Sequence, residues 1–382
     1  MRVLILGGDG YLGWPTAMHL AQRGHRVCVV DNYLRRTLAL QTRSEALFPT
    51  PSLPERAEAF EARSGQRIEV VVGDCTDASL LSRVFAEFQP DGAVHYAEQP
   101  SAPYSMIGFD EARLTLRNNL DVTFNLIWSV LRHAPDCHIV KLGTMGEYGT
   151  PDIDIEEGWI EISHKGRSDR FLFPRAAGSL YHTTKVLDTD LLWFYTRIQG
   201  LRVTDLMQGP VYGLCVDGAS LPDALLPNFH YDDIFGTLVN RFLVQAVSGV
   251  PLTVYGKGNQ KRGYLNLKDT LQCVELALSH PVERGMLRIL NQFTEVFSVN
   301  ELAERVRRVG RDMGMDVKIE HLRNPRKEKE EHYYNPAHSG LLDLGLRPHP
   351  IEDGVIAEML STVSRFADRI DVQKIHPRVR WS

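Results

Sequence analysis

The chain has 382 residues, of which 43% are hydrophobic and 24% are charged, and its formal net charge is −5. This length predicts two or three structural units, and the composition is that of an ordinary soluble globular protein with a large buried core. Because no basic block stands out, a nucleic-acid partner is not expected, and no stretch approaches the ~18 apolar residues of a membrane span.

The cysteines favour a reducing compartment. Cys28 and Cys137 lie in apolar, strand-like runs, where a buried thiol is the ordinary interpretation, and the five cysteines show no CxxC or metal-ligand spacing. We therefore expect neither a disulfide framework nor a bound metal. The apolar run within residues 1–6 is too short for a signal peptide. These features together predict a cytoplasmic protein.

The strongest motif is the first predicted strand, residues 2–6, with the turn after it. Gly7, Gly10 and Gly13 are spaced three apart, where a strand has to stop, turn and start a helix. Gly7 would make the tight turn, Gly10 would let the backbone approach a pyrophosphate, and Gly13 would let the helix pack on the strand. The predicted helix 14–23 then offers N-terminal N–H groups to an anion. A tight turn without a ligand is the alternative.

A second predicted strand, residues 26–30, ends in Asp31, which stands 24 positions after Gly7. A carboxylate at this place accepts a hydrogen bond from a ribose hydroxyl and repels a 2′-phosphate, so NAD is favoured over NADP. Arg35 and Arg36 follow, and their charges leave NADP open as the alternative. The strand, turn, helix and acidic residue together predict a dinucleotide site.

Strands and helices alternate through the first half of the chain. Strands are expected over residues 68–72, 92–95, 138–142 and 201–206, and helices over 77–88, 110–133 and 179–199. This alternation predicts an α/β protein with a Rossmann fold, in which helices cover both faces of a doubly wound parallel sheet.

Two loops are expected to interrupt this alternation. The insertion 32–66 contains three prolines and is expected to cover a site. The polar run 98–106 follows a strand's carboxyl end, where ligands bind in such sheets.

The pattern changes after residue 212. We expect an NAD-binding Rossmann domain over residues 1–212 and a smaller α/β lobe over 213–382 that mainly binds the substrate. Some segments of this lobe are expected to return to the first domain.

Three residues predict a hydride-transfer site. Thr144 stands in the glycine-rich run 143–149 after a strand, and Tyr181 and Lys185 are four apart on a predicted helix, so they share one helix face. An ordinary solvated Tyr/Lys pair is the alternative. A free tyrosine titrates near ~10, but a neighbouring ammonium and an oxidised nicotinamide lower its pKa. The phenolate can then take a proton from a sugar hydroxyl, held by Thr144, while the carbon gives hydride to the cofactor.

At these residues the chain resembles the extended short-chain dehydrogenases/reductases. Within that superfamily of NAD-dependent epimerases and dehydratases, it closely resembles the UDP-sulfoquinovose synthase family, from Gly7 to Trp381. Its most specific segments are Thr144-Met145-Gly146-Glu147-Tyr148 and Glu331-His332-Tyr333-Tyr334.

The resemblance implies an NAD-dependent reaction on UDP-glucose. C4 is oxidised, water is lost across C5–C6, sulfite adds at C6, and the hydride returns to C4. Related 4,6-dehydratases usually carry an Asp-Glu pair after the strand-end threonine, whereas this chain has Met145 and Gly146. Glu147 or His182 is therefore expected to handle the C5 proton or the leaving hydroxyl.

We further expect a large set of binding residues. The cofactor-binding set is Gly7, Gly10, Tyr11, Leu12, Gly13, Asp31, Asn32, Arg35, Asp74, Cys75, Asn118, Tyr181, Lys185, Gln208 and Val211. The substrate-binding set is Thr144, Met145, Gln208, Arg241, Arg262 and Arg326. Arginine suits a diphosphate because its guanidinium makes paired hydrogen bonds. Sulfite or a sulfite-delivering protein is a further expected partner, and helices 110–133 and 179–199 are expected to pair in a homodimer.

One position departs from the family pattern. An arginine normally precedes the Ser-Ala-Pro-Tyr-Ser run, but this chain has Pro100 before Ser101. Proline has neither a charge nor a donor, so any contact that this arginine makes to a sugar or sulfur anion is lost. Two functions therefore stay open, a UDP-sulfoquinovose synthase and a 5,6-dehydratase that acts on a nucleotide sugar or nucleoside without sulfite. A non-catalytic NAD-binding sensor is less consistent with the retained Thr144, Tyr181 and Lys185.

Overall fold

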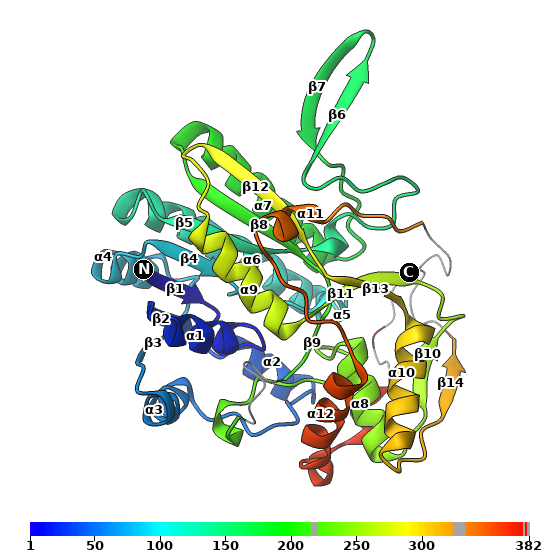
Figure 1. Cartoon of the computed structure of the whole chain (residues 1–382). Helices are drawn as coiled ribbons and strands as arrows, with labels where there is room; N and C mark the ends of the chain where they lie inside the picture. The colour runs from blue at the N-terminus through cyan, green and yellow to red at the C-terminus, as the bar shows by residue number, and fades with distance from the viewer. Residues whose placement is uncertain (215–220, 324–332, 377–378, 380–382) are drawn as a thin grey trace.

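The computed structural model describes residues 1–214, 221–323, 333–376 and 379. Its centre is a seven-stranded parallel sheet in the order β12-β8-β5-β4-β1-β2-β3 (Figure 1). The strands are β1 Arg2–Leu6, β2 Arg26–Asp31, β3 Ile68–Val72, β4 Gly92–His95, β5 His138–Thr144, β8 Arg202–Gln208 and β12 Met286–Gln292. The chain order reverses between β1 and β4, and ligands bind at such a reversal in open α/β sheets.

Helices cover both faces of this sheet, each over its own apolar core. One core is built with α1 Gly13–Gln22, α3 Leu53–Ser64 and α9 Leu267–Ser279. The other is built with α4 Ala78–Phe88, α6 Phe109–His133 and α7 Leu180–Gln199. Central strands such as β2, with four consecutive buried residues, are apolar on both sides because helices cover both. The predicted doubly wound α/β fold is confirmed.

The insertion 32–66 is not the irregular loop that the prolines predicted. It contains α2 Leu34–Gln41 and α3. Ser52 and Glu55 form a capping box at the start of α3, and Pro54 stands in its first turn, where a missing N–H costs nothing. The prolines therefore start a helix here. The run 98–106 likewise contains a short helix, α5 Ala102–Ser105.

The C-terminal half builds most of a third apolar core. Its helices are α8 Leu238–Ser248, α10 Val299–Asp312, α11 Ser339–Asp343 and α12 Asp353–Ser364. Its strands outside the large sheet are β9 Val211–Tyr212, β10 Leu252–Tyr255, β11 Lys261–Asn266, β13 Glu295–Ser298 and β14 Ile319–Leu322. Strand β12 instead pairs with β8 in the large sheet, so the chain returns to it after residue 212. A boundary at residue 212 stays a prediction.

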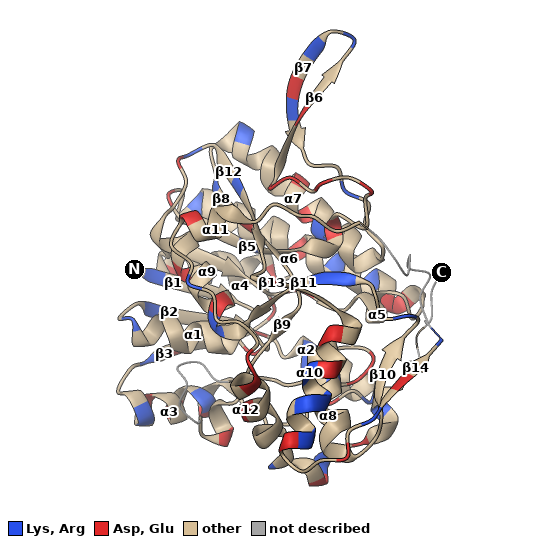
Figure 2. Ribbon diagram, turned by 45° about the vertical axis from the view of Figure 1, so that its right-hand side comes forward, with Lys and Arg blue, Asp and Glu red and all other residues tan. Residues whose placement is uncertain are grey.

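An antiparallel hairpin that the sequence analysis did not predict projects from the body (Figure 1). It consists of β6 Trp159–His164 and β7 Arg167–Leu172. Lys165 and Gly166 join them with φ of 49° and 75°, the backbone of a tight two-residue hairpin turn. Figure 2 shows basic and acidic residues alternating along β7. At its base, Trp159 meets Trp193 of α7 edge to face at 5.0 Å.

Short 3₁₀ turns complete the element list, at Met145–Glu147, Asp223–Leu225, Ala367–Arg369 and Val372–Ile375. Cys28, Cys75, Cys137 and Cys273 are buried and free of disulfides. Within the described residues, no helix is long and apolar enough to cross a membrane.

Candidate active site

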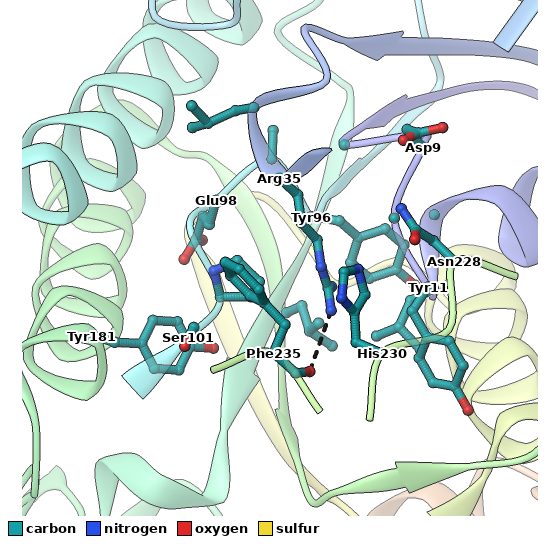
Figure 3. Close-up of a pocket in the computed structure, with 18 of the residues that line it drawn as sticks. Asp9, Tyr11, Arg35, Tyr96, Glu98, Ser101, Tyr181, Asn228, His230 and Phe235 are labelled. Carbon is teal, nitrogen blue, oxygen red and sulfur yellow. Dashed lines mark hydrogen bonds between the residues drawn. The ribbon is translucent and has the colours of Figure 1, made fainter. Parts of the chain in front are cut away.

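A pocket of about 410 Å³ opens at the carboxyl ends of the central strands, where the strand order reverses (Figure 3). The first wall is the glycine-rich turn after β1, and the second comes from the residues that follow β2 and β4. A third wall comes from Thr144 and Tyr181, and a fourth from the segment 228–241 of the C-terminal half. Both halves of the chain therefore contribute to one cavity.

The glycine-rich turn has the shape that a dinucleotide requires. Gly7 has φ +88°, and a Cβ there would lie 2.6 Å from the Tyr96 carbonyl carbon. A Cβ at Gly13 would collide with the Gly7 carbonyl oxygen, so α1 needs this glycine to pack. A Cβ at Gly10 would meet only the Gly7 oxygen at 3.7 Å. Because no protein atom crowds the backbone at Gly10, a ligand can approach the backbone closely there.

Asp31, at the end of β2, is held by two backbone groups. Its carboxylate accepts from the N–H of Asp9 at 2.9 Å and from the N–H of Tyr33 at 2.7 Å. Burial, together with the charge on Asp9, raises the pKa of Asp31 to about 6. Arg36 makes a two-pronged pair with Asp9, at 2.7 and 2.5 Å. The Arg36 guanidinium therefore has a carboxylate partner inside the protein, which removes the support of this arginine for a 2′-phosphate.

Most of the predicted cofactor-binding residues line the pocket. Arg35 crosses it, with its guanidinium 5.3 Å from the Phe235 ring and a 3.4 Å hydrogen bond to the Phe235 oxygen (Figure 3). The other lining members of that set are Gly7, Gly10, Tyr11, Leu12, Gly13, Asp31, Asn32, Asp74, Cys75, Asn118, Tyr181, Gln208 and Val211. These residues would hold NAD, whose dinucleotide suits a glycine-rich turn followed by an acidic strand end.

Three of the predicted catalytic residues, Thr144, Tyr181 and Lys185, stand at the end of β5 and near the start of α7. Thr144 and Tyr181 line the pocket, while Lys185 is buried behind it. Ser179 caps α7, and the Tyr181 N–H donates to Ser105 Oγ at 3.1 Å, which ties this helix to α5. Burial raises the pKa of Tyr181, and the charges of Glu98 and Glu147 add to the rise. The phenol is therefore protonated in the protein without ligands.

A buried lysine lies directly behind these residues. Lys141 Nζ donates to Thr189 Oγ1 at 2.7 Å, to Asp205 Oδ2 at 3.1 Å and to the Lys185 carbonyl at 3.1 Å. It also lies 3.2 Å from Glu147 Oε1, an oxygen that accepts from the Thr144 N–H at 3.3 Å. One ammonium thus links the backbones of the strand-end threonine and the catalytic helix.

Comparison with known proteins agrees with this geometry. The family model described as the NAD dependent epimerase/dehydratase family matches residues 3–291. The chloroplastic UDP-sulfoquinovose synthase of Spinacia oleracea is 46% identical over 380 residues, covering 100% of this chain and 79% of that protein. The UDP-sulfoquinovose synthase of Sulfolobus acidocaldarius is 43% identical over 384 residues, covering 100% and 98%.

The chain belongs to the NAD-dependent epimerase/dehydratase family and, within it, to the UDP-sulfoquinovose synthase family. Among solved structures, the UDP-glucose 4-epimerase from Bifidobacterium longum, in complex with NAD⁺ and UDP, has a TM-score of 0.70 at 19% identity. The match covers 98% of this chain and 100% of the chain in that structure. At 19% identity, this similarity shows a shared fold. The predicted family membership and the assignment of NAD as its cofactor are confirmed.

Within this family's site, Glu147 and His182 differ in their surroundings. Glu147 is fully buried among Lys141, Thr144 and Arg175, whose Nε lies 3.4 Å from Glu147 Oε2, and it does not line the pocket. Its proton-handling role stays a prediction, and its contacts favour a positioning role. His182 Nδ1 lies 3.0 Å from Ser179 Oγ, and its ring covers Gly146, where a Cβ would overlap it. The His182 ring lies 5.2 Å from that of Tyr181, and its predicted proton-handling role stays a prediction.

The predicted substrate-binding residues of this family are only partly brought together. Gln208 lines the pocket, and so does Arg241, which stacks over Tyr255 at 4.5 Å. Met145 and Arg262 are not among the lining residues, and Arg262 donates to the Lys261 carbonyl at 2.8 Å. Arg326 lies outside the described residues.

Several pocket residues were missed by sequence reasoning. They include Glu98, Asn228, His230 and Asp232. Glu98 stood in the run 98–106, which the sequence analysis placed at a strand's carboxyl end. That placement was the signal that could have identified it. The segment 228–232 carries no motif, and no sequence signal identified it. Within the described ranges, no group of three or more His, Cys, Asp or Glu side chains is placed to hold a metal ion.

Proposed function

We propose that this protein is a UDP-sulfoquinovose synthase, which converts UDP-glucose and sulfite into a UDP-linked 6-sulfo sugar. The observation that carries the proposal is a pocket with Thr144 and Tyr181 on one wall, in a chain that is 43–46% identical to two such synthases over its whole length. A protein that only binds NAD would not be expected to have both Thr144 and Tyr181 at its ligand pocket.

Thr144, Tyr181 and Lys185 each have a separate role in the oxidation at C4, the first step of the reaction. Bound NAD supplies the hydride acceptor. Thr144 is suited to hold the C4 hydroxyl in line, and Tyr181 to remove its proton. Lys185 stands one helical turn after Tyr181, with its ammonium on the same helix face. Oxidation at C4 acidifies the C5 proton, so hydroxide can leave C6, sulfite can add there, and the hydride can return to C4.

Pro100 is compatible with sulfite addition because the pocket keeps other cations. An unpaired anion in a closed, low-dielectric site costs several kcal/mol. Pro100 lines the pocket and supplies no charge, but Arg35 and Arg241 line the same cavity. We therefore propose that the substitution is tolerated. A 5,6-dehydratase without sulfite addition is the second candidate, and Pro100 is the observation that favours it.

The substitution Tyr181→Phe tests the hydride step. It removes the phenol but keeps the ring, so UDP-glucose binding should change little while reduction of bound cofactor falls by at least about a hundredfold. Nicotinamide absorbance after rapid mixing reports the reduction, and calorimetry reports the binding. Reduction at the wild-type rate in this variant would reject the assignment of Tyr181.

We also propose that the protein is a homodimer formed through α6 and α7, with sulfite or a sulfite-delivering protein as a further partner. The support for the dimer is a set of exposed apolar residues on these two packed helices, Leu116, Phe124, Leu187, Phe194 and Ile198. Sedimentation at equilibrium should give twice the chain mass of 43.2 kDa; a monomer would refute the dimer. A cytoplasmic location stays a prediction, since the spinach relative is named as chloroplastic.

A further inference from the structure

A buried group of ionisable side chains surrounds Lys185. Its Nζ lies 2.5 Å from Glu98 Oε1, and His95 Nε2 lies 3.3 Å from the same oxygen. Asp188 stands three positions after Lys185 on α7 and is fully buried. The Lys185 and Glu98 side chains are only 3% and 4% exposed, so water screens their charges little.

Glu98 belongs to the pocket as well as to this group. It follows β4 at the carboxyl edge of the sheet and lines the cavity. Its second carboxylate oxygen, Oε2, is buried and has no hydrogen-bond partner in the part of the chain that the structure describes. In Figure 3, Glu98 and Tyr181 lie at the same end of the pocket, away from Asp9. One oxygen of this carboxylate therefore pairs with Lys185, and the other has capacity to take a proton or a ligand donor.

The negative charge on Glu98 opposes the base that the hydride step needs. Burial raises the pKa of Tyr181, and the charge on Glu98 is the next largest cause of the rise. Lys185 is the ammonium expected to lower that pKa, but Glu98 compensates it at 2.5 Å. Tyr181 therefore needs an acceptor for its own proton before it can take one from a sugar hydroxyl.

Three neighbours of Lys185 are poor acceptors. Burial raises the pKa of Asp188 well above its usual range, and the charge on Glu98 adds to the rise, which favours the protonated form that has no capacity to accept. Burial lowers the pKa of His95 to about 4, so its imidazole is neutral at pH 7 and hard to protonate. Lys141 is a cation and has no capacity to accept. The carboxylate of Glu98 is the acceptor that this group supplies.

We propose that Glu98 is the proton acceptor of the hydride step and acts through Lys185. Lys185 gives a proton to Glu98 and takes the proton of Tyr181, whose phenolate then removes the proton of the C4 hydroxyl as the C4 hydride leaves for the cofactor. When hydride returns to the C4 ketone, the proton follows the same path back. The group gains one positive charge with the substrate proton, and the hydride neutralises the positive charge of the oxidised nicotinamide, so the charge of the site as a whole is unchanged. This inference rests on the proposed function, because it uses the C4 oxidation of that reaction.

The substitution Glu98→Gln tests this path through its pH profile. Wild-type cofactor reduction by UDP-glucose should be nearly independent of pH between about 6 and 8, because the proton stays inside the protein. In Glu98→Gln the proton must leave for solvent, so the rate should fall about tenfold for each unit by which the pH drops below the Tyr181 pKa. Glu98→Asp keeps an acceptor and should restore a flat profile. Glu61→Gln, an exposed carboxylate change on α3, is the matched control. A Glu98→Gln profile parallel to that of the wild type would overturn the proposal.

A second readout needs no turnover. Tyrosinate absorbance is measured against pH in the NAD complexes of the wild type and of Glu98→Gln. The same titrations of Tyr181→Phe and of the Glu98→Gln, Tyr181→Phe double variant are subtracted, which leaves the signal of Tyr181. Removing the carboxylate should shift the Tyr181 signal to lower pH, and an unshifted signal would contradict the coupling. If UDP-glucose fails to reduce the wild-type cofactor, the proposed function fails, whereas this titration still decides whether Glu98 controls Tyr181. Cofactor content and thermal unfolding confirm that each variant is folded.

Discussion

At the scale of single residues, Asp31 should make the affinity for NAD depend on pH. Burial and the charge on Asp9 raise its pKa to about 6 in the unliganded protein. The ionised carboxylate is the form that accepts best from a ribose hydroxyl, so NAD affinity should fall as the pH drops through about 6. A hydrogen bond to a charged group contributes about 1.5–3 kcal/mol, which corresponds to a loss of roughly ten- to a hundredfold in affinity. Calorimetric titration of cofactor-free protein with NAD between pH 5 and 8 measures this.

The matched control for this prediction is Asp31→Asn, which mimics the protonated side chain in shape. Its NAD affinity should be reduced at pH 8 to nearly the wild-type value at pH 5 and should then change little with pH. Equal affinity of wild-type protein at pH 5 and pH 8 would refute the role of Asp31. Preference for NADP by the wild-type protein would refute it as well.

Residue-level prediction from the sequence succeeded where a side chain belonged to a recognisable motif. The glycines of the first turn, Asp31, Thr144 and Tyr181 all line the pocket, as expected. Glu98 was missed because its importance depends on Lys185, 87 positions away, whose ammonium lies against it only in the folded chain. The burial of Glu147 behind the site was missed for the same reason, since its partners Lys141 and Arg175 come from β5 and from the segment before α7.

At the scale of elements, Lys141 joins β5, α7 and β8. It is fully buried and meets Glu147, Asp205 and Thr189 within 3.2 Å. Breaking a buried charge group by removing one member typically costs about 3–5 kcal/mol, because the remaining charges stay desolvated and unpaired. Lys141→Met should therefore lower the free energy of unfolding by about that amount, as measured by urea denaturation.

The same substitution should also slow cofactor reduction, because Lys141 links the backbones that carry Thr144 and Lys185. The control is Lys318→Met, whose side chain is 67% exposed and pairs with Asp316 at 3.0 Å. It should change the unfolding free energy by less than about 0.5 kcal/mol. If Lys141→Met were as stable as the wild type, the buried contacts of Lys141 would not be important for the stability of the fold.

Helices and strands were predictable from the sequence where their pattern of hydrophobic residues was long and regular. Six strands of the parallel sheet, all but β12, and the helices α6 and α7 have nearly the expected bounds. The hairpin β6–β7 was missed because its residues are mainly exposed and charged, so no buried face marks it. Helix α3 was missed because a proline near a helix start resembles a loop proline in sequence.

At the scale of the whole molecule, the second lobe closes the pocket against the first. Ser101 Oγ donates to the Ile234 carbonyl at 2.5 Å, and the Leu47 N–H donates to the Phe229 carbonyl at 2.8 Å. Arg56 donates to the Leu226 carbonyl at 3.1 Å. These bonds tie the segment that precedes α8 to the cofactor half. The sequence alone predicted a second lobe but not this contact, which forms between segments without a motif.

The central claim is that this pocket adds sulfite to a UDP-sugar despite Pro100. The most direct measurement incubates the purified protein with UDP-glucose, with and without sulfite, and determines the masses of the nucleotide products. The account predicts a sulfonated UDP-sugar that forms only with sulfite and disappears in Tyr181→Phe. An unsaturated product that is unaffected by sulfite, or turnover of a free nucleoside but not of UDP-glucose, would contradict it.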